Sequence, residues 1–310
     1  MEHDTGGDPI TGLKWSRRTT KKVAKALRKV GIEVGSKTVG RLLKKLGFSL
    51  RVNHKKIESG NRNPPKPQER DRQFNYIGTL RESFARRGEP IISVDTKKKE
   101  LVGNFKNGGR SWEKEAIHVF DHDFPSDAVG RVIPYGIYDT QANRGFVCVG
   151  NSAETPAFAV DCIERWWKEE GRDRYPHTAK LLILADCGGA NSARSRVWKY
   201  RIQKQLCDAH RLTITVCHYP PGTSKWNPIE HRLFSEISKN WAGKPLTSFR
   251  TALHYIRTTK TSSGLGVQAL FIRKKYKNGE RVPQAHMDTL RLSTPKTSPA
   301  WNYTLSPYKM

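Results

Sequence analysis

The 310-residue sequence predicts an α/β protein in which a mixed sheet, covered by helices on both faces, follows a small all-α unit. Two observations predict this class, and a third indicates the kind of partner. The middle of the chain reads as three strands followed by helix, strand, helix, strand and helix. A hydrophobic content of 36%, with eight Trp and eleven Phe, can fill a large core. The formal charge of +27 indicates a polyanionic partner, DNA or RNA.

The positive charge is concentrated near the two ends of the chain. Residues 14–58 carry fifteen Lys or Arg and a net charge of +13, and residues 243–310 carry twelve and a net charge of +10. The rest of the chain shares only +4, so we expect the ends to bind and the middle to have another task. The chain then divides into a loose tail at 1–13, a helical DNA-binding domain at 14–58, a linker at 59–73, an α/β domain at 74–242 and a basic C-terminal extension at 243–310.

Two short helices are expected in the first basic region. Val23, Leu27 and Val30 share one face, Gly31 ends that helix, and Ser36 caps a second one with four apolar residues on one side. This pattern predicts a helix-turn-helix. The alternative is a basic helical hairpin without sequence preference. The second helix would present to DNA the side chains of Lys37, Thr38, Arg41, Lys44 and Lys45.

After the proline-containing linker, an amphipathic helix is expected from Phe74 to Gly88. After this helix, short apolar runs and amphipathic segments predict the strands and helices of the α/β domain. Strands are predicted at 91–94, 132–138, 145–149, 181–185 and 212–217, with helices from 155 to 171 and from 191 to 209. This order predicts a mixed sheet whose ligands bind beyond the carboxyl ends of its strands.

The last predicted helix runs from Asn227, an expected N-cap, to Trp241. Its apolar face consists of Leu233, Phe234, Ile237 and Trp241. Counting back by three and four from Leu233 and Phe234 places Glu230 in the first turn, on the side that faces the core. Glu236 lies on the solvent face with Arg232 and Lys239. Alone, Glu230 can equally be a capping acid favoured by the helix dipole.

Two other acids follow predicted strands directly. Asp95 and Asp186 each occupy a strand end, where Asp is also an ordinary turn residue. Together with Glu230 they form a set of three carboxylates with no Lys or Arg expected among them. Such carboxylates repel one another unless divalent cations lie between them.

The spacing and the local strings resemble DDE transposases and integrases of the ribonuclease-H-like fold. Asp186 lies 91 residues after Asp95, and Glu230 lies 44 residues after Asp186. The strings are similar to those of bacterial insertion-sequence transposases of the ISAzo-thirteen type, over roughly residues 14–310. They are DTKKKELVGNFKNGGRSW at 95–112, HDFPS at 122–126, DCGGANSARSRVWK at 186–199 and PPGTSKWNPIEHRLF at 220–234.

The resemblance implies a DNA transposase that acts on transposon ends and target DNA with two Mg²⁺ or Mn²⁺ ions. Asp95, Asp186 and Glu230 would be both the catalytic and the metal-binding residues, with Asp95 as the bridging ligand. A homo-oligomer on double-stranded DNA is expected. The alternatives are an inactive remnant that only binds DNA, and a ribonuclease-H-like nuclease without strand transfer. Members of the family usually have a longer N-terminal region, so a truncated copy is a further alternative.

No apolar leader and no run of roughly 20 apolar residues occurs in the sequence, so we expect a cytoplasmic protein without membrane contact. The resemblance further implies a bacterial, nucleoid-associated protein. The five cysteines form no Cys-x-x-Cys pair and indicate reduced core residues. His231 follows Glu230 directly. It fits either a contact with phosphate or metal-bound water, or an ordinary surface position.

Overall fold

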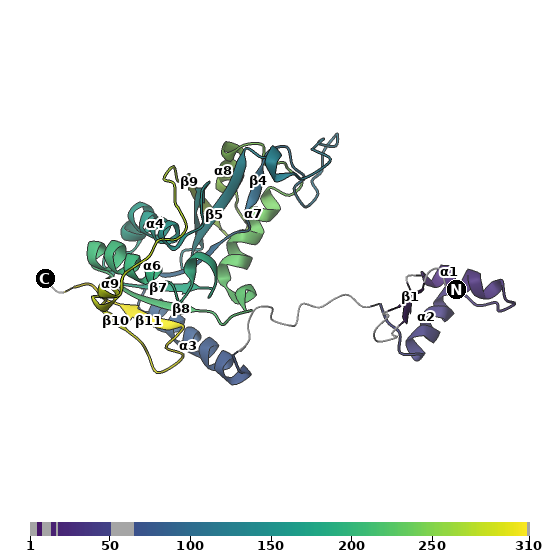
Figure 1. Cartoon of the computed structure of the whole chain (residues 1–310), viewed down its shortest axis with the longest axis horizontal. Coiled ribbons are helices and arrows are strands. Elements are labelled where there is room, and N and C mark those ends of the chain that lie inside the picture. The colour runs from purple at the N-terminus through teal and green to yellow at the C-terminus, as the bar shows by residue number, and fades with distance from the viewer. Residues whose placement is uncertain (1–4, 8–13, 17, 51–64, 309–310) are drawn as a thin grey trace. The chain divides into compact units, whose positions relative to one another are not determined.

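The computed structural model describes residues 5–7, 14–16, 18–50 and 65–308. It divides into two units, Met1–Gly60 and Asn61–Met310 (Figure 1). Residues 59–64 of the predicted linker, most of the predicted tail and residues 51–58 of the predicted DNA-binding domain lie outside the described residues.

The first unit contains the two predicted helices, α1 (Thr20–Arg28) and α2 (Ser36–Lys45). Gly31 stands between them with a φ of +83°, a conformation that favours glycine. Two short antiparallel strands, β1 (Thr5–Gly7) and β2 (Lys14–Ser16), precede the helices. Residues 5–7 therefore belong to a strand and not to the loose tail expected at 1–13, because main-chain pairing needs no apolar pattern.

The capping and packing of α2 differ from the prediction. Ser36 is the first helical residue, and Gly35 occupies the N-cap without a side-chain bond. Of the four apolar residues expected on one face, only Val39 is buried, while Leu42 and Leu46 are 44% and 72% exposed. The described part of this unit therefore covers little of that face.

The second unit is built on one mixed sheet. Its strands lie in the order β10, β11, β8, β7, β3, β5, β6 and β9, and β4 pairs with β5 outside this path. Their bounds are β3 Ile91–Thr96, β4 Glu100–Val102, β5 Gly130–Asp139, β6 Arg144–Gly150, β7 Lys180–Ala185, β8 Thr213–His218, β9 Gly266–Phe271, β10 Leu292–Ser293 and β11 Asn302–Leu305.

The five predicted strands form the middle of this sheet. β3 is central. On one side β5 pairs antiparallel with β3 and β6 pairs antiparallel with β5, and on the other side β7 and β8 run parallel to β3. Read in chain order, the five strands lie as third, second, first, fourth, fifth. This mixed arrangement, with helices on both faces, confirms the predicted ribonuclease-H-like class.

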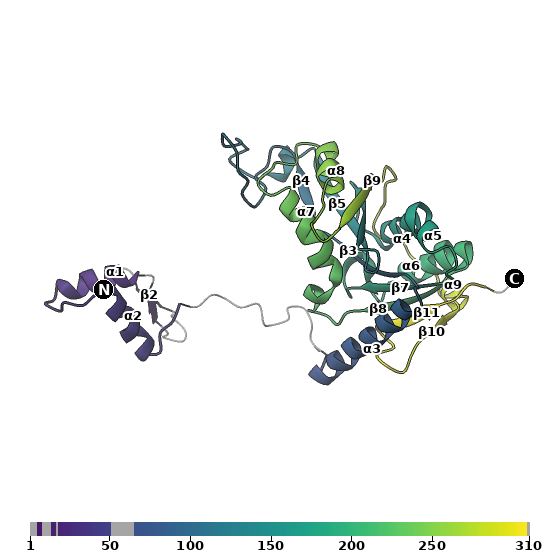
Figure 2. The ribbon, with the colours of Figure 1, turned by 180° about the vertical axis from the view of Figure 1, so that it is seen from behind.

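Alternate residues of each strand face opposite layers. Ile92 and Val94 pack with one layer of helices, whereas Ile91 packs with α3 on the other face. Figures 1 and 2 show α4 and α6 on one side of the sheet and α7 and α8 on the other. The helical segments are α3 Pro67–Arg86, α4 Pro156–Trp166, α5 Arg172–Arg174, α6 Arg196–Arg201, α7 Ser235–Asn240, α8 Phe249–Arg257 and α9 Gln284–Asp288, with π-helical continuations at Trp167–Gly171 and Ile202–Asp208.

The predicted linker ends earlier than expected. α3 begins at Pro67, inside the interval 59–73, because proline suits the first helical turn and Gln73 is itself fully buried. Within the described residues, no helix has the length and apolar character needed to cross a membrane.

The C-terminal region is part of the sheet and not a separate basic extension. β9 pairs in parallel with β6 at one edge, and β11 pairs antiparallel with β8 toward the other (Figure 2). Both strands are short or only partly buried, so their sequences lack the continuous apolar run of a central strand. The expected division at residue 243 is therefore wrong for the α/β domain.

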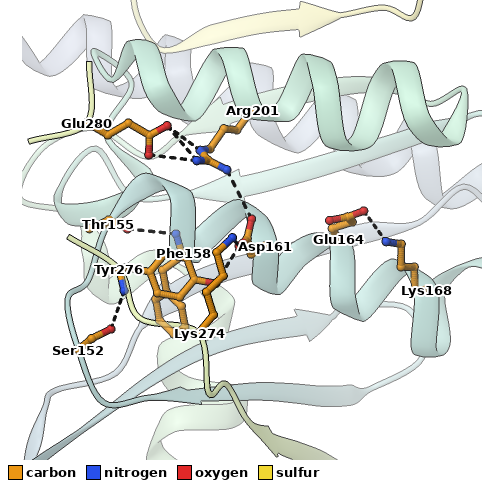
Figure 3. Close-up of polar contacts among 10 residues, drawn as sticks. All are labelled: Ser152, Thr155, Phe158, Asp161, Glu164, Lys168, Arg201, Lys274, Tyr276 and Glu280. Atoms are coloured by element: carbon orange, nitrogen blue, oxygen red, sulfur yellow. Dashed lines mark hydrogen bonds and ion pairs between the residues drawn. The ribbon is translucent and has the colours of Figure 1, made fainter. Parts of the chain in front are cut away.

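Polar contacts fasten the segment after β9 to α4 and α6 (Figure 3). Asp161 of α4 accepts hydrogen bonds from Lys274 Nζ at 2.6 Å and Tyr276 Oη at 2.8 Å. Arg201 of α6 lies 3.7 Å from the other carboxylate oxygen and forms a bidentate pair with Glu280 at 2.9–3.1 Å. The positive charge of this segment is thus partly used to hold it in place.

Candidate active site at the end of the central strands

Strands β3 and β7 bring two of the predicted acids together. In their parallel ladder Val94 lies opposite Ala185, so the next residues, Asp95 and Asp186, stand side by side at the carboxyl ends. Asp95 is on the same face as Ser93, two residues earlier in the strand. This is the face covered by the helix that contains Glu230.

That helix extends over 228–240 and begins with a π-helical turn, Glu230–Phe234, before continuing as α7. Leu233, Phe234, Ile237 and Trp241 are all buried, which confirms the predicted apolar face. Single π-helical turns inside helices are frequent at functional sites. Glu230 opens this turn and is half-buried, whereas Glu236 is ion-paired with Lys239 at 2.6 Å.

A glycine allows this helix to approach the sheet. Gly136 of β5 lies opposite Asp95 in the ladder. A Cβ atom at Gly136 would come within 2.5 Å of Phe234 and 2.9 Å of Ile229. Any larger residue would push the helix outward and move Glu230 away from the strand end.

Asn227 holds the helix to β3 in a way that the sequence did not predict. Its side chain does not cap the helix; Oδ1 accepts a hydrogen bond from the Ser93 hydroxyl, and Nδ2 donates to the carbonyl of Val94 at 3.4 Å. The Ser93 hydroxyl in turn accepts from the N–H of Ile229 at 3.1 Å. The expected N-cap is therefore a buried link that fixes Glu230 relative to the strand of Asp95.

Burial and neighbouring carboxylates raise the pKa values of the two strand-end acids. Burial raises the pKa of Asp95 to about 8, and the charges of Asp186, Glu230 and Glu154 add to the shift. The N–H of Thr96, which donates to Asp95 at 2.7 Å, opposes it. Burial likewise raises the pKa of Asp186 to about 6, with further contributions from Glu154 and Glu230. Three predicted acids and a fourth thus share one electrostatic environment.

A lysine lies beside the carboxylates, where none was expected. Lys97 is 8% exposed, its Nζ is 3.8 Å from Glu100, and it lies 4.7 Å from the centre of the Trp241 ring. Burial lowers the pKa of Lys97. Burial raises the pKa of Glu230, and the charge of Lys97 opposes that rise. The prediction of a cluster without a cation is therefore wrong on the Glu230 side.

The fourth acid, Glu154, was missed in the sequence. It stands directly before Thr155, whose hydroxyl caps α4 by accepting from the Phe158 N–H at 3.1 Å, so it reads as an ordinary residue at a helix start. Its carboxylate is 2.9 Å from Lys99 Nζ. A Cβ at Gly189, three residues beyond Asp186, would lie 2.9 Å from Glu154. A glycine pair after a strand-end acid is the only sequence signal for this approach.

Comparison of the sequence with known proteins gives the family of the chain. The family model described as the Rhodopirellula transposase DDE domain matches residues 1–307. The chain belongs to this DDE transposase family. None of the curated proteins matches it significantly in sequence.

Solved structures give a weaker likeness to this DDE-family chain. A Mos1 transposase paired-end complex with the left transposon end is 13% identical, with a TM-score of 0.46 over 77% of this chain and 65% of that one. The Mos1 mariner paired-end complex with Mn is 14% identical, with a TM-score of 0.45 and coverages of 77% and 65%. The chain thus spans about 65% of the length of the Mos1 chains that it matches.

The acids at this strand end fit divalent cations chemically, although they do not form a closed ligand set. In the part of the chain that the structure describes, no three His, Cys, Asp or Glu side chains are arranged to hold a metal ion. Asp186 Oδ1, however, is buried with no hydrogen-bond partner there. A buried carboxylate oxygen without a donor is costly unless a cation completes it.

The remaining predicted residues lie outside this cluster. His231 is exposed, and its Nε2 forms a hydrogen bond with the carbonyl of Lys225. In the first unit, the predicted DNA contacts fall on α2. Lys37, Arg41, Lys44 and Lys45 are exposed, and Thr38 is half-buried.

Proposed function

We propose that the protein is a DNA transposase that cleaves and joins strands at insertion-sequence ends, with Asp95, Asp186 and Glu230 as its catalytic, metal-binding residues. One observation carries the proposal: Asp95 and Asp186 stand side by side at the carboxyl ends of two central strands, and the charges of Asp186 and Glu230 raise the pKa of Asp95, in a chain with a charge of +27. Membership of the DDE transposase family supports it.

The proposed chemistry assigns different work to each residue. Two Mg²⁺ or Mn²⁺ ions, when bound, would activate the attacking oxygen and stabilise the leaving one in an in-line displacement at phosphorus. Asp95, at the end of the central strand, would hold both ions; Asp186 would offer its unpartnered Oδ1 to one, and Glu230 would serve the other. Lys97 would balance the charge on the Glu230 side.

For substrate binding, we propose that α2 lies along duplex DNA in a homo-oligomeric complex, with phosphates contacted by Lys37, Thr38, Arg41, Lys44 and Lys45. Arg41→Ala should weaken duplex binding by the full chain. The slope of log K against log salt should become shallower by roughly 0.9, the value for one phosphate contact. Unchanged binding across a KCl series would remove this role.

The central test is Glu230→Gln, because the change preserves size and capping ability but removes the charge that would hold a divalent ion. Mg²⁺-dependent nicking of a plasmid carrying the DNA that flanks the reading frame should fall by about 10³-fold or more. Glu236→Gln, on the same helix but paired with Lys239, is the matched control and should nick normally. A folded Glu230→Gln protein that nicks like the control would end the three-carboxylate mechanism.

The same assay separates the two alternatives. A remnant that only binds DNA would shift the plasmid without nicking it. A nuclease without strand transfer would nick it but would not join a labelled 3′ end to a second plasmid, whereas a transposase should give joined products.

A further inference from the structure

A second site lies on the helix of Glu230, away from the carboxylates. It is a cavity of about 330 Å³ between the C-terminal half of α3, the turn after β5 and the start of the helix over 228–240. Two arginines and four neutral polar residues line most of it: Arg81, Arg232, Tyr138, Thr140, Asn143 and Ser263.

The two arginines are free to bind a ligand. In the described chain, neither Arg81 nor Arg232 makes a hydrogen bond or an ion pair, and no Asp or Glu lines the cavity. Two further cavities differ in this respect. One includes Glu100 and Asp123, and the other includes Glu89 and an arginine that is already held by Glu170 and Asp139.

The neutral side chains form the wall and already have partners. Tyr138 Oη donates to Asn143 Oδ1 at 2.9 Å, Asn143 Nδ2 donates to the Ser263 carbonyl at 2.9 Å, and the Thr140 hydroxyl donates to the Ile91 carbonyl at 3.1 Å. The unused donors are therefore the N–H groups of two guanidinium forks. Such forks match the oxygens of a phosphate and bind it with charge-assisted hydrogen bonds.

We propose that Arg81 and Arg232 together bind one backbone phosphate of the DNA whose reacting phosphate lies at Asp95, Asp186 and Glu230. The proposal rests on the proposed transposase function. Arg232 follows Glu230 by two residues, so the two side chains leave the helix on opposite sides. A helix with its side chains is about 10–12 Å across, close to the width of about 12 Å of a major groove. In this proposal one duplex lies against both sides of the helix, and the charge of +27 favours DNA over other anions.

Duplex binding by the full chain in EDTA tests this site independently of the reaction. A labelled duplex of about 30 base pairs is titrated by fluorescence anisotropy over a KCl series, with melting temperatures as the check on folding. Arg81→Gln combined with Arg232→Gln should weaken binding about tenfold near 0.1 M salt and lower the salt slope by about 0.9, one phosphate. Each single change should cause most of this loss, because both arginines hold the same phosphate.

The matched control removes two exposed arginines outside the cavity, Arg86 of α3 and Arg250 of α8, by substitution with Gln. Equal losses in the two double variants would overturn the proposal, since a general loss of charge would then explain both. A small anion as the true ligand would also overturn it. In that case inorganic phosphate or AMP would raise the melting temperature of the native chain but not of the Arg81/Arg232 variant, with duplex binding unchanged.

Failure of the proposed reaction is separately visible. A native chain that never nicks DNA with Mg²⁺ contradicts the transposase proposal, whereas the binding measurement in EDTA still decides whether Arg81 and Arg232 hold a phosphate.

Discussion

Two acidic positions in the same unit have opposite surroundings. Asp161 of α4 has a lysine, a tyrosine hydroxyl and an arginine around its carboxylate (Figure 3). Asp95 is half-buried and has other carboxylates near it, and both raise its pKa. The first acid is compensated by the chain itself and holds the C-terminal segment. The second is compensated only in part, so it is suited to a cation that comes from outside.

Substitution of each acid in turn tests this comparison and should give the largest effect. Asp95→Asn should lower Mg²⁺-dependent nicking by about 10³-fold or more while the protein stays folded, because a metal ligand is lost. Asp161→Asn should keep nicking but lower the free energy of unfolding by about 1–3 kcal/mol, because charged hydrogen bonds are lost. Nicking assays and urea unfolding on both variants check this. A fully folded Asp161→Asn protein that no longer nicks DNA would contradict the different roles of the two acids.

Metal binding should sharpen the comparison through stability. Mg²⁺ or Mn²⁺ at about one hundred times its dissociation constant should stabilise the native chain by about 2.7 kcal/mol. The gain should persist in Asp161→Asn and vanish in Asp186→Asn, whose substitution removes the unpartnered Oδ1. Thermal melts with EDTA and with each metal measure it. An equal gain in all three proteins would place the cation elsewhere.

A third expected effect is a dependence of stability on pH without metal. The folded-state pKa values of Asp95 and Asp186, about 8 and about 6, exceed their ordinary value of 3.8, so the native state holds protons that the unfolded state has released. Their contribution to stability is therefore complete below about pH 4 and is lost as the pH rises toward 8. Asp95→Asn should gain stability relative to the native chain between pH 5.5 and 8.5. Urea unfolding in EDTA between pH 5.5 and 8.5 measures the difference in free energy of unfolding between Asp95→Asn and the native chain. A difference that stays constant with pH would contradict the prediction.

The sequence predicts the middle of the fold well because its central strands are buried on both faces and read as continuous apolar runs. It also predicts the half-buried position of Glu230 on the helix, since a helix has a fixed period and its apolar residues define the inner face. β9 and β11 were missed because β9 lies at an edge of the sheet, β11 has only four residues, and their partners lie more than 80 residues away in the chain.

Within the site, the sequence could not predict the contacts between residues that lie far apart in the chain. The Ser93–Asn227 link joins residues 134 apart, and Glu154 reaches Asp95 and Asp186 only because the turn at Gly189 leaves room. Lys97 looks like one of three consecutive lysines, yet it alone is buried, over Trp241. No local pattern distinguishes it.

The placement of β9 and β11 also fixes when the domain can finish folding during synthesis. The acids at 95, 186 and 230 leave the ribosome first, while the strands that pair beside β6 and β8 arrive only with residues 266–271 and 302–305. Until then the nascent sheet has two open edges, which are the surfaces through which incomplete chains aggregate. A ribosome that stops near residue 242 would release a chain with all three acids and no closed sheet.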